Sequence, residues 1–183
     1  MSKKKKAAET PLAEVFRFCP RCGQAAESVG ENPFHCSACG YSHYFTPVAA
    51  VAGIIADQQQ QVLFIRRQKD PGKGKLCAPG GFVDPGEGAE EALIREIREE
   101  VNLQAEQLQY LASFPNRYVY RGVATWVTDV FYTCQVESFE DIAAQEGEVE
   151  EWLFLRPTRR ELRRMAFESH RQALEIYLQQ RTA

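Results

Sequence analysis

Three glutamates lie close together in a stretch whose pattern predicts a helix. Glu96, Glu99 and Glu100 are spaced i, i+3 and i+4, and this spacing puts their carboxylates on one helix face. Like charges held that close repel each other unless water screens them or a cation binds among them. Hard divalent cations such as Mg²⁺ and Mn²⁺ prefer carboxylate oxygens as ligands. The cluster therefore indicates a metal site, although a solvated surface helix can also be rich in glutamate.

A glycine turn, Pro79-Gly80-Gly81, precedes this helix. Glycine lets the backbone approach a ligand closely. We therefore expect a backbone carbonyl of the turn, with Gly81 as the candidate, to complete the ligand set.

Four cysteines form a second candidate metal site. They are spaced as Cys19-x-x-Cys22 and Cys36-x-x-Cys39, with thirteen residues between the two pairs. This spacing suits tetrahedral Zn²⁺ held by four thiolates, and two disulfides are the competing interpretation. The N-terminal residues lack the apolar core of a secretory signal. We therefore expect a cytoplasmic protein, in which reduced thiols favour structural zinc.

The stretch from the glycine turn to the end of the acidic helix resembles the Nudix box, G-x5-E-x7-R-E-U-x-E-E-x-G-U, where U is a bulky aliphatic residue. The matching residues are Gly81, Glu87, Arg95, Glu96, Ile97, Glu99, Glu100 and Leu103. Asn102 stands where the family has glycine, and Asn tolerates the left-handed backbone expected after a helix end. The resemblance covers residues 48–157 and implies an α/β/α sandwich around a mixed sheet.

Nudix enzymes hydrolyse a nucleoside diphosphate linked to another moiety, so the resemblance implies a pyrophosphohydrolase that uses Mg²⁺ or Mn²⁺. In such a reaction water attacks phosphorus, and positioning and charge neutralisation do most of the catalysis. We expect Glu99 and Glu100 to be the main metal ligands, with Glu96 as the third acid. The Gly81 carbonyl is expected beside them, and Glu87 is expected to bind the metal through water.

Two further catalytic roles need candidates. Arg95 is expected to fix the rotamer of a glutamate, because a guanidinium can hold a carboxylate by two hydrogen bonds. Nudix enzymes often take their general base from a loop before a strand that carries tryptophan, and the acidic stretch before Trp152 fits that place. Glu146 is our first choice as base and Glu148 the second, with Glu96 as another alternative. The competing interpretation is a solvated acidic loop.

Five residues are candidates for substrate contacts. Arg66 and Arg67 end a strand-like run that should point at the site, and strand alternation sends only one of them inward. Arg117, Tyr118 and Tyr120 have the chemistry to hold a phosphate and stack a base. An ordinary aromatic patch or a dimer contact is the competing interpretation of these three.

We expect three segments along the chain. Residues 1–13 form a disordered basic tail, and residues 14–45 form a zinc ribbon too small to hold a core without its metal. Residues 46–183 form the Nudix domain with C-terminal helices. In this domain the pattern predicts strands at Val48–Ala56, Val62–Arg67, Gln109–Phe114, Thr125–Val136 and Trp152–Leu155, and helices at Ala89–Val101, Arg160–Met165 and His170–Gln180.

A zinc ribbon before a Nudix domain is similar to the architecture of the zinc-ribbon Nudix hydrolases, which include NADH pyrophosphatases. The NADH pyrophosphatase signature, S-Q-P-W-P-F-P-x-S, is matched only at Ser113 and Pro115. ADP-ribose, FAD, NADH and dinucleoside polyphosphates are therefore all open as substrates.

Net charge and hydropathy limit the classes of molecule that this protein is expected to bind. The net charge of −3 predicts no bulk attraction to nucleic acid, and no apolar run reaches the length of a membrane span. We expect a small nucleotide diphosphate substrate, no nucleic-acid or membrane partner, and leave a homodimer open. The alternative function is a nucleotide-sensing binding protein whose ribbon docks a partner. Such sensors usually lose acids of the box, all of which this chain keeps, so the enzyme is favoured.

Overall fold

The computed structural model describes residues 9–182, so most of the expected basic tail, residues 1–8, lies outside the described part. Contacts divide the chain into two units. One unit comprises the chain up to Pro47 together with Arg117–Trp126, and the other comprises Val48–Asn116 and the chain from Val127 onward. No helix among the described residues is long and apolar enough to cross a membrane.

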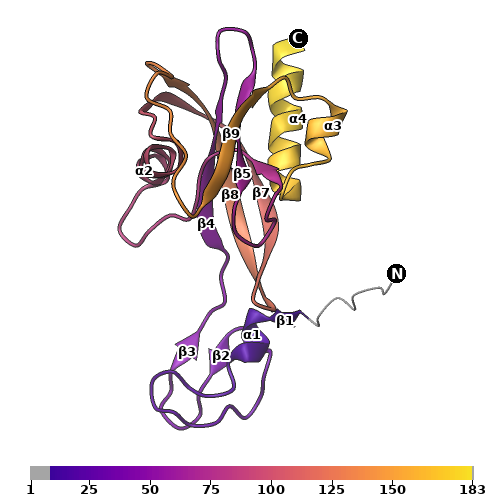
Figure 1. The fold of residues 1–183 in the computed structure, drawn as a ribbon. Coiled ribbons are helices and arrows are strands. Elements are labelled where there is room, and N and C mark those ends of the chain that lie inside the picture. The colour runs from indigo at the N-terminus through magenta and orange to yellow at the C-terminus, as the bar shows by residue number, and fades with distance from the viewer. Residues whose placement is uncertain (1–8, 183) are drawn as a thin grey trace, which may run out of the picture. The chain divides into compact units, whose positions relative to one another are not determined.

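Four helices are interspersed among the nine strands of the described residues, and most of the strands follow one another directly along the chain (Figure 1). Their bounds are β1 Thr10–Pro11, α1 Leu12–Val15, β2 Phe34–His35, β3 Ser42–His43, β4 Val48–Ile55, β5 Val62–Arg67, β6 Leu76–Cys77, α2 Ala89–Val101, β7 Ala105–Tyr120, β8 Val123–Val136, β9 Val149–Leu155, α3 Arg159–Leu162 and α4 Glu168–Thr182.

Two sheets form the framework of the larger unit. β8 pairs with β7 on one side and runs parallel to β4 on the other, with Val48 opposite Val127 and Ile55 opposite Cys134. β5 lies between β6 and β9 and is antiparallel to both. β4 and β5 are consecutive, and a bridge between Ala56 and Val62 closes the turn that joins them. This is the mixed α/β architecture expected from the sequence.

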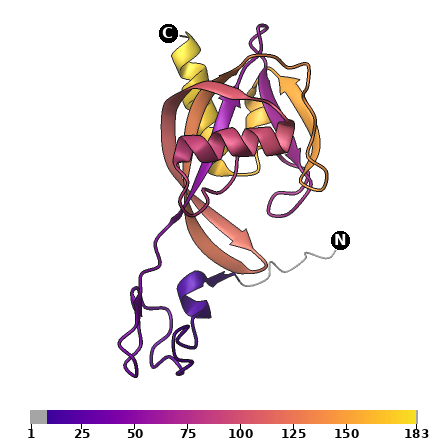
Figure 2. The same cartoon turned by 90° about the vertical axis from the view of Figure 1, so that its left-hand side faces the viewer.

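Helices cover both faces of these sheets, with α2 on one side and α3 and α4 on the other (Figure 1). α2 lies across the strands (Figure 2) and buries Leu93, Ile97 and Val101 against the sheet. Leu174 and Tyr177 of α4 pack on the opposite face, in a second core that includes β4 and β5 side chains. Apolar residues three or four apart on each helix make this packing possible, because they lie on one helix face.

Five elements, besides α3, differ in extent from the sequence prediction. β4 ends at Ile55, one residue before the expected end. β7 is longer than the expected Gln109–Phe114, β8 and β9 begin earlier, and α4 begins two residues before the expected His170. Side chains of β7 alternate only loosely between exposed and buried, so periodicity marks its ends poorly.

The helix expected at Arg160–Met165 ends at Leu162 instead. The residues that follow pair with β6: the Leu76 N–H donates to the Arg164 carbonyl at 3.0 Å and the Ala166 N–H to the Leu76 carbonyl at 2.7 Å. Backbone groups bound to a strand cannot continue a helix, and this competition was not visible in the local sequence.

The smaller unit has little regular structure and a small core. Cys19, Phe34 and Cys36 are buried in it, and the Phe16 ring packs edge-on against Phe45 with centroids 4.7 Å apart. β1 pairs with the beginning of β8, with Thr10 opposite Val123. The tail expected to end at residue 13 therefore gives way to regular structure from Thr10 onward.

Candidate active site

The acidic helix α2 has the predicted bounds, and its ends explain why. At its N-terminus the Gly88 N–H donates to the Glu91 carboxylate at 2.8 Å, and acids are favourable at this end of a helix dipole. At its C-terminus Asn102 adopts the left-handed conformation, with φ 55°, and donates its N–H to the Arg98 carbonyl. Asn is thus accepted at the position where the Nudix box has glycine.

The glycine turn passes too close to the β4 backbone for a side chain at Gly80, and a side chain at Gly81 would displace the Glu96 carboxylate. A Cβ on Gly80, whose φ is +146°, would lie 2.1 Å from the Val51 carbonyl oxygen. A Cβ on Gly81 would lie 2.5 Å from the Glu96 carboxylate. β4 holds the turn in place, because the Val51 N–H donates to the Gly81 carbonyl at 2.8 Å and the Gly53 N–H to the Pro79 carbonyl at 2.9 Å.

Glu100 is a buried carboxylate, only 6% exposed. Its Oε2 accepts the Gly80 N–H at 2.7 Å. Burial raises the pKa of Glu100 to about 8, and the negative charge of Glu96 adds to the rise while the Gly80 hydrogen bond opposes it. An ionised carboxylate in this position is costly unless positive charge compensates it.

Glu96 and Glu99 have different surroundings from Glu100. Burial raises the pKa of Glu96, with the charges of Glu99 and Glu148 adding to the rise, although Arg95 opposes it. The Glu99 side chain is 49% exposed. The shared helix face expected from the spacing thus carries one buried, one half-buried and one exposed acid.

Arg95 connects an acid of the loop before α2 with two acids of the helix. Its Nη1 donates to Glu96 at 2.8 Å and to Glu99 at 3.2 Å. Its Nε and Nη2 donate to the two carboxylate oxygens of Glu87, each at 2.9 Å. Its Nη2 also donates to the Phe82 carbonyl at 3.1 Å. The guanidinium therefore occupies the position expected for a residue that fixes glutamate rotamers.

Glu87 is engaged by Arg95 through both oxygens, and Glu87 Oε2 also accepts the Asp84 N–H at 3.1 Å. The hydrogen bonds with Arg95 lower the pKa of Glu87. Its carboxylate is therefore ionised and paired, and it connects the loop before α2 to the helix.

The two candidate bases lie in the same loop but differ in their surroundings. Glu148 is among the charges that raise the pKa of both Glu96 and Glu100. Its Oε1 accepts a hydrogen bond from Lys69 at 2.9 Å. Both glutamates are exposed to solvent, and only Glu148 is among these charges. The structure thus associates Glu148 with the acids through its charge.

Arg66 and Arg67 separate as strand alternation requires, with a register shift between them. The Arg66 Nε pairs with Glu151 at 2.6 Å. Arg67 donates to the Pro71 carbonyl at 2.8 Å, and its guanidinium lies 5.2 Å from the centre of the Phe167 ring. Its charge acts on Glu100 and counteracts the effect of burial on that carboxylate's pKa. Arg67 is therefore the member of the pair on the side of the acids.

The other candidate substrate contacts belong to the smaller unit, within Arg117–Trp126. Arg117 forms an ion pair with Glu9. Tyr120 is half exposed, and the Arg121 guanidinium lies 5.4 Å from the centre of its ring. Tyr118, between them on β7, is half-buried.

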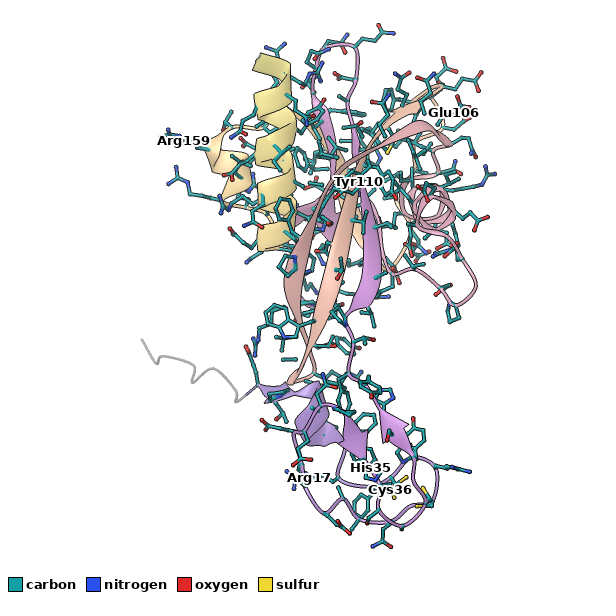
Figure 3. All side chains as sticks on the ribbon, turned by 180° about the vertical axis from the view of Figure 1, so that it is seen from behind. Arg17, His35, Cys36, Glu106, Tyr110 and Arg159 are labelled. Carbon is teal, nitrogen blue, oxygen red and sulfur yellow. The ribbon has the colours of Figure 1, made fainter. Side chains whose placement is uncertain are left out.

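The four cysteines of the predicted zinc site lie together in the smaller unit. Figure 3 labels Cys36, one of the four, and draws sulfur in yellow. The four sulfurs all lie within 4.8 Å of one another, with Cys19 and Cys39 at 3.7 Å and Cys22 and Cys36 also at 3.7 Å. A tetrahedral ion with Zn–S bonds of about 2.3 Å requires sulfur separations of about 3.8 Å. A disulfide needs sulfurs about 2.05 Å apart, so the geometry suits a metal and excludes the disulfide alternative.

Both cysteine pairs have the same backbone turn. The Gly23 N–H donates to the Cys19 carbonyl and the Gly40 N–H to the Cys36 carbonyl, each at 2.9 Å. The two glycines have φ values of 77° and 72°. Among the described residues, these cysteines form the only group of three or more potential metal ligands whose ligand atoms all lie within 4.8 Å. The acids of α2 do not form such a group.

Sequence reasoning missed two contributors near the acids. Lys69 pairs with Glu148, and the His170 imidazole accepts the Ala78 N–H beside the glycine turn at 3.3 Å. His170 is separated from Ala78 by 92 positions, so no local spacing pattern connects them. A lysine in a loop rich in glycine and lysine gave no sign that it would face an acid.

This fold and this arrangement of acids, arginine and glycine turn define a class of protein. Residues 46–175 match the model of the NUDIX domain family. The chain therefore belongs to the Nudix family.

Individual relatives agree with this assignment. The chain is 31% identical over 134 residues to an NAD-capped RNA hydrolase NudC from Pseudomonas fluorescens, covering 70% of this chain and 48% of that protein. It is 43% identical over 79 residues to an ADP-ribose pyrophosphatase from Methanocaldococcus jannaschii, covering 42% of this chain and 46% of that one. The chain thus spans about half the length of these relatives.

A solved structure shows the same fold over most of the chain. The crystal structure of a NUDIX hydrolase from Nitrosomonas europaea matches with a TM-score of 0.69 at 22% sequence identity, and the match covers 91% of this chain and 92% of that one.

The burial of Glu100 leads to a prediction for metal-free protein. Because folding raises the pKa of this carboxyl to about 8, its stabilising contribution is complete below its unfolded pKa of about 4.3 and is lost as pH rises through the folded value. Glu100→Gln cannot ionise and can still accept the Gly80 N–H. We expect the difference in free energy of unfolding, Glu100→Gln minus wild type, to increase by about 2–4 kcal/mol from pH 5 to pH 8. Urea unfolding in the presence of chelator measures it.

The matched control is Glu99→Gln, which changes an acid one position away whose side chain is 49% exposed. Its stability relative to wild type should stay nearly constant over the same pH range. A Glu100→Gln difference that also stays constant would contradict the assigned cost of ionising the buried acid.

Proposed function

We propose that this protein is a metal-dependent pyrophosphohydrolase that cleaves the diphosphate bond of a nucleoside diphosphate derivative. The observation that carries the proposal is the buried Glu100 carboxylate, which accepts the Gly80 N–H at 2.7 Å beside Glu96. A structural role alone would favour an apolar residue in that position, because an unpaired buried carboxylate destabilises a fold. A site that binds a cation explains why an acid is there.

The donor set fits Mg²⁺ or Mn²⁺. Glu96, Glu99 and Glu100 offer carboxylate oxygens, the ligand type that these ions prefer. The Gly81 carbonyl accepts one hydrogen bond from Val51 and, like other carbonyls, has a second lone pair. When bound, the ion would neutralise charge on the diphosphate and make water a better nucleophile.

Each protein group then has a role in orientation. Gly80 holds one oxygen of Glu100, and Arg95 holds Glu96 and Glu99. We propose that Glu87 acts through Arg95, because both of its oxygens are bonded to that guanidinium. Arg67, whose positive charge acts on Glu100, is proposed to contact a phosphate oxygen of the substrate.

We propose Glu148 as the general base, in preference to Glu146. Glu148 acts electrostatically on Glu96 and Glu100, and Lys69 holds its Oε1 at 2.9 Å. A carboxylate near the metal ligands can accept the proton of the attacking water at its other oxygen.

The relatives suggest the substrate class. One is named for NAD-capped RNA and another for ADP-ribose, and both names describe a diphosphate with adenosine on one side. We therefore propose an adenosine diphosphate derivative as substrate. Arg117, Tyr118 and Tyr120 lie in the smaller unit, and their contact with the substrate stays a prediction from the sequence.

We further propose that the four cysteines bind a structural Zn²⁺. The sulfur separations of 3.7 Å support this, because they match the edge of a Zn–S tetrahedron of about 3.8 Å. The small core of that unit, with two of its cysteines buried, needs the metal for stability.

Purified protein is expected to hydrolyse at least one member of a panel of ADP-ribose, NADH, FAD, a dinucleoside polyphosphate and NAD-capped RNA when Mg²⁺ or Mn²⁺ is present. Glu100→Gln and Glu96→Gln should each lower kcat by about 100-fold or more, because a lost metal ligand leaves charge on the diphosphate uncompensated. Release of nucleotide measured by chromatography gives the rate.

The matched control is Glu106→Gln, which removes the same charge from an exposed position on β7 (Figure 3) and should retain wild-type activity. Tight nucleotide binding without turnover of any compound in the panel would contradict the enzyme and favour the sensor.

The choice of base is tested by two variants of one loop. Glu148→Gln should lower kcat by about 100-fold, whereas Glu146→Gln should stay within about threefold of wild type. Steady-state kinetics on the best substrate decide between them. The reverse order would show that Glu146 supplies the base.

Zinc is tested by elemental analysis. Reduced protein freed of loosely bound metal should carry one zinc per chain, and Cys22→Ser should lower that value because a ligand is lost. Cys134→Ala, which removes a buried thiol of the other unit, should leave zinc unchanged. Wild-type protein with clearly less than one zinc would refute the site.

A further inference from the structure

The glycine turn is braced from several directions. β4 bonds the carbonyls of Pro79 and Gly81, and α2 bonds the Gly80 N–H through Glu100. Leu76, at the start of β6, bonds both of its backbone groups to the chain between α3 and α4. The Ala78 N–H, two residues before Gly80, has a side chain as its acceptor: Nδ1 of His170, at 3.3 Å.

The imidazole of His170 is held in a fixed orientation. The Phe131 ring meets it edge to face, with centroids 5.0 Å apart and an interplanar angle of 88°. The Phe167 ring lies on another side, with centroids 5.5 Å apart. These two contacts fix the rotamer that aims Nδ1 at the Ala78 N–H. A nitrogen that accepts a hydrogen bond carries no proton, so the neutral ring has its proton on Nε2.

The surroundings keep this histidine neutral. Burial lowers its pKa to about 3, and the positive charge of Arg67 contributes to the decrease. A protonated ring would turn an N–H toward the Ala78 N–H and break the contact. The acceptor is therefore present throughout the neutral pH range.

The beginning of α4, which carries His170, is itself anchored. Ser169 is fully buried and donates through its hydroxyl to the Asp129 carboxylate of β8 at 2.5 Å. Asn116 of β7 also hydrogen-bonds Asp129. A carboxylate at a helix N-terminus is favourable. This buried polar cluster links the first turn of α4 to the sheet.

We propose that His170 is a positioning residue for the active site, which holds the Ala78 amide so that the Gly80 N–H points at Glu100. The proposal rests on the proposed function for its kinetic consequence. Its geometric part does not depend on that function. Three hydrogen-bonded pairs, Asp129–Ser169, His170–Ala78 and Gly80–Glu100, connect the sheet through α4 and the glycine turn to α2. The other backbone bonds of the turn would survive a substitution at position 170, so this contact is the one that the side chain controls.

Two substitutions separate the acceptor of His170 from its ring. His170→Asn keeps an oxygen near the position of Nδ1 but loses the aromatic ring. His170→Phe keeps the ring between Phe131 and Phe167 but has no acceptor. A residue that only fills space should tolerate Phe better than Asn, whereas a positioning acceptor should tolerate Asn better than Phe.

Amide hydrogen exchange by NMR provides a readout that needs no activity. In His170→Phe, the Ala78 and Gly80 amides should exchange about tenfold faster than in wild type, the factor that corresponds to losing one hydrogen bond. In His170→Asn, both should stay within about threefold of wild type. Exchange at Gly80 that is unchanged in His170→Phe overturns the proposal, whether or not the protein is an enzyme.

Kinetics give the second readout. His170→Phe should need about fivefold more Mg²⁺ for half-maximal rate, with KM for substrate at saturating Mg²⁺ unchanged, because the displaced Gly80 no longer orients Glu100. If no compound of the panel is hydrolysed by wild type, the proposed function fails and the exchange result still decides the role of His170.

If His170→Phe does not fold, wild-type protein supplies the test. Nitrogen NMR of the imidazole at pH 7 should show a protonated Nε2 and an unprotonated Nδ1. A proton on Nδ1 would overturn the proposal, because that nitrogen could not then accept from Ala78.

Discussion

The hydrogen bond between the Gly80 N–H and the buried Glu100 carboxylate is the contact on which the rest of the site depends. It joins the turn before the helix to the helix itself, and it requires a backbone that passes too close to β4 for any side chain at position 80. Around it, the sheet supplies hydrogen bonds to the turn, and α2 supplies the acid. The arrangement holds a carboxylate in a position where its charge is unfavourable without a cation, as expected for a preorganised metal site.

Arg95 balances the acids that surround this contact. Its guanidinium contacts Glu87, Glu96 and Glu99 together, and the hydrogen bonds with Glu87 and Glu96 raise its own pKa. A single guanidinium bound to several carboxylates offsets the repulsion between them. Because Glu96 and Glu99 each accept only one hydrogen bond from Arg95, both keep oxygen lone pairs that can bind another ligand. In the cysteine cluster, by contrast, the four sulfurs lie at separations that suit one tetrahedral ion.

Prediction succeeded where information is local. The bounds of α2 follow from apolar periodicity and from a residue that tolerates the left-handed conformation at its end, and the sulfur cluster follows from two short repeats separated by a loop. It failed where distant segments compete for the same backbone groups. The helix expected at Arg160–Met165 ends at Leu162, because residues 164 and 166 bond Leu76 instead. Likewise, Arg117–Trp126 belongs to the unit that holds the cysteines, although most residues of β7 and β8, the two strands it joins, belong to the larger unit.

The sequence by itself determined the family, the acids, the arginine and the glycines, since their chemistry requires particular residue types at fixed spacing along one helix and one turn. Only the tertiary structure decided how the three acids differ, with Glu100 buried, Glu96 half-buried and Glu99 exposed. It also decided that Glu148 acts on them and that His170 holds the turn. Burial and long-range contacts depend on how separate elements pack against each other, and spacing along a single element does not contain that information.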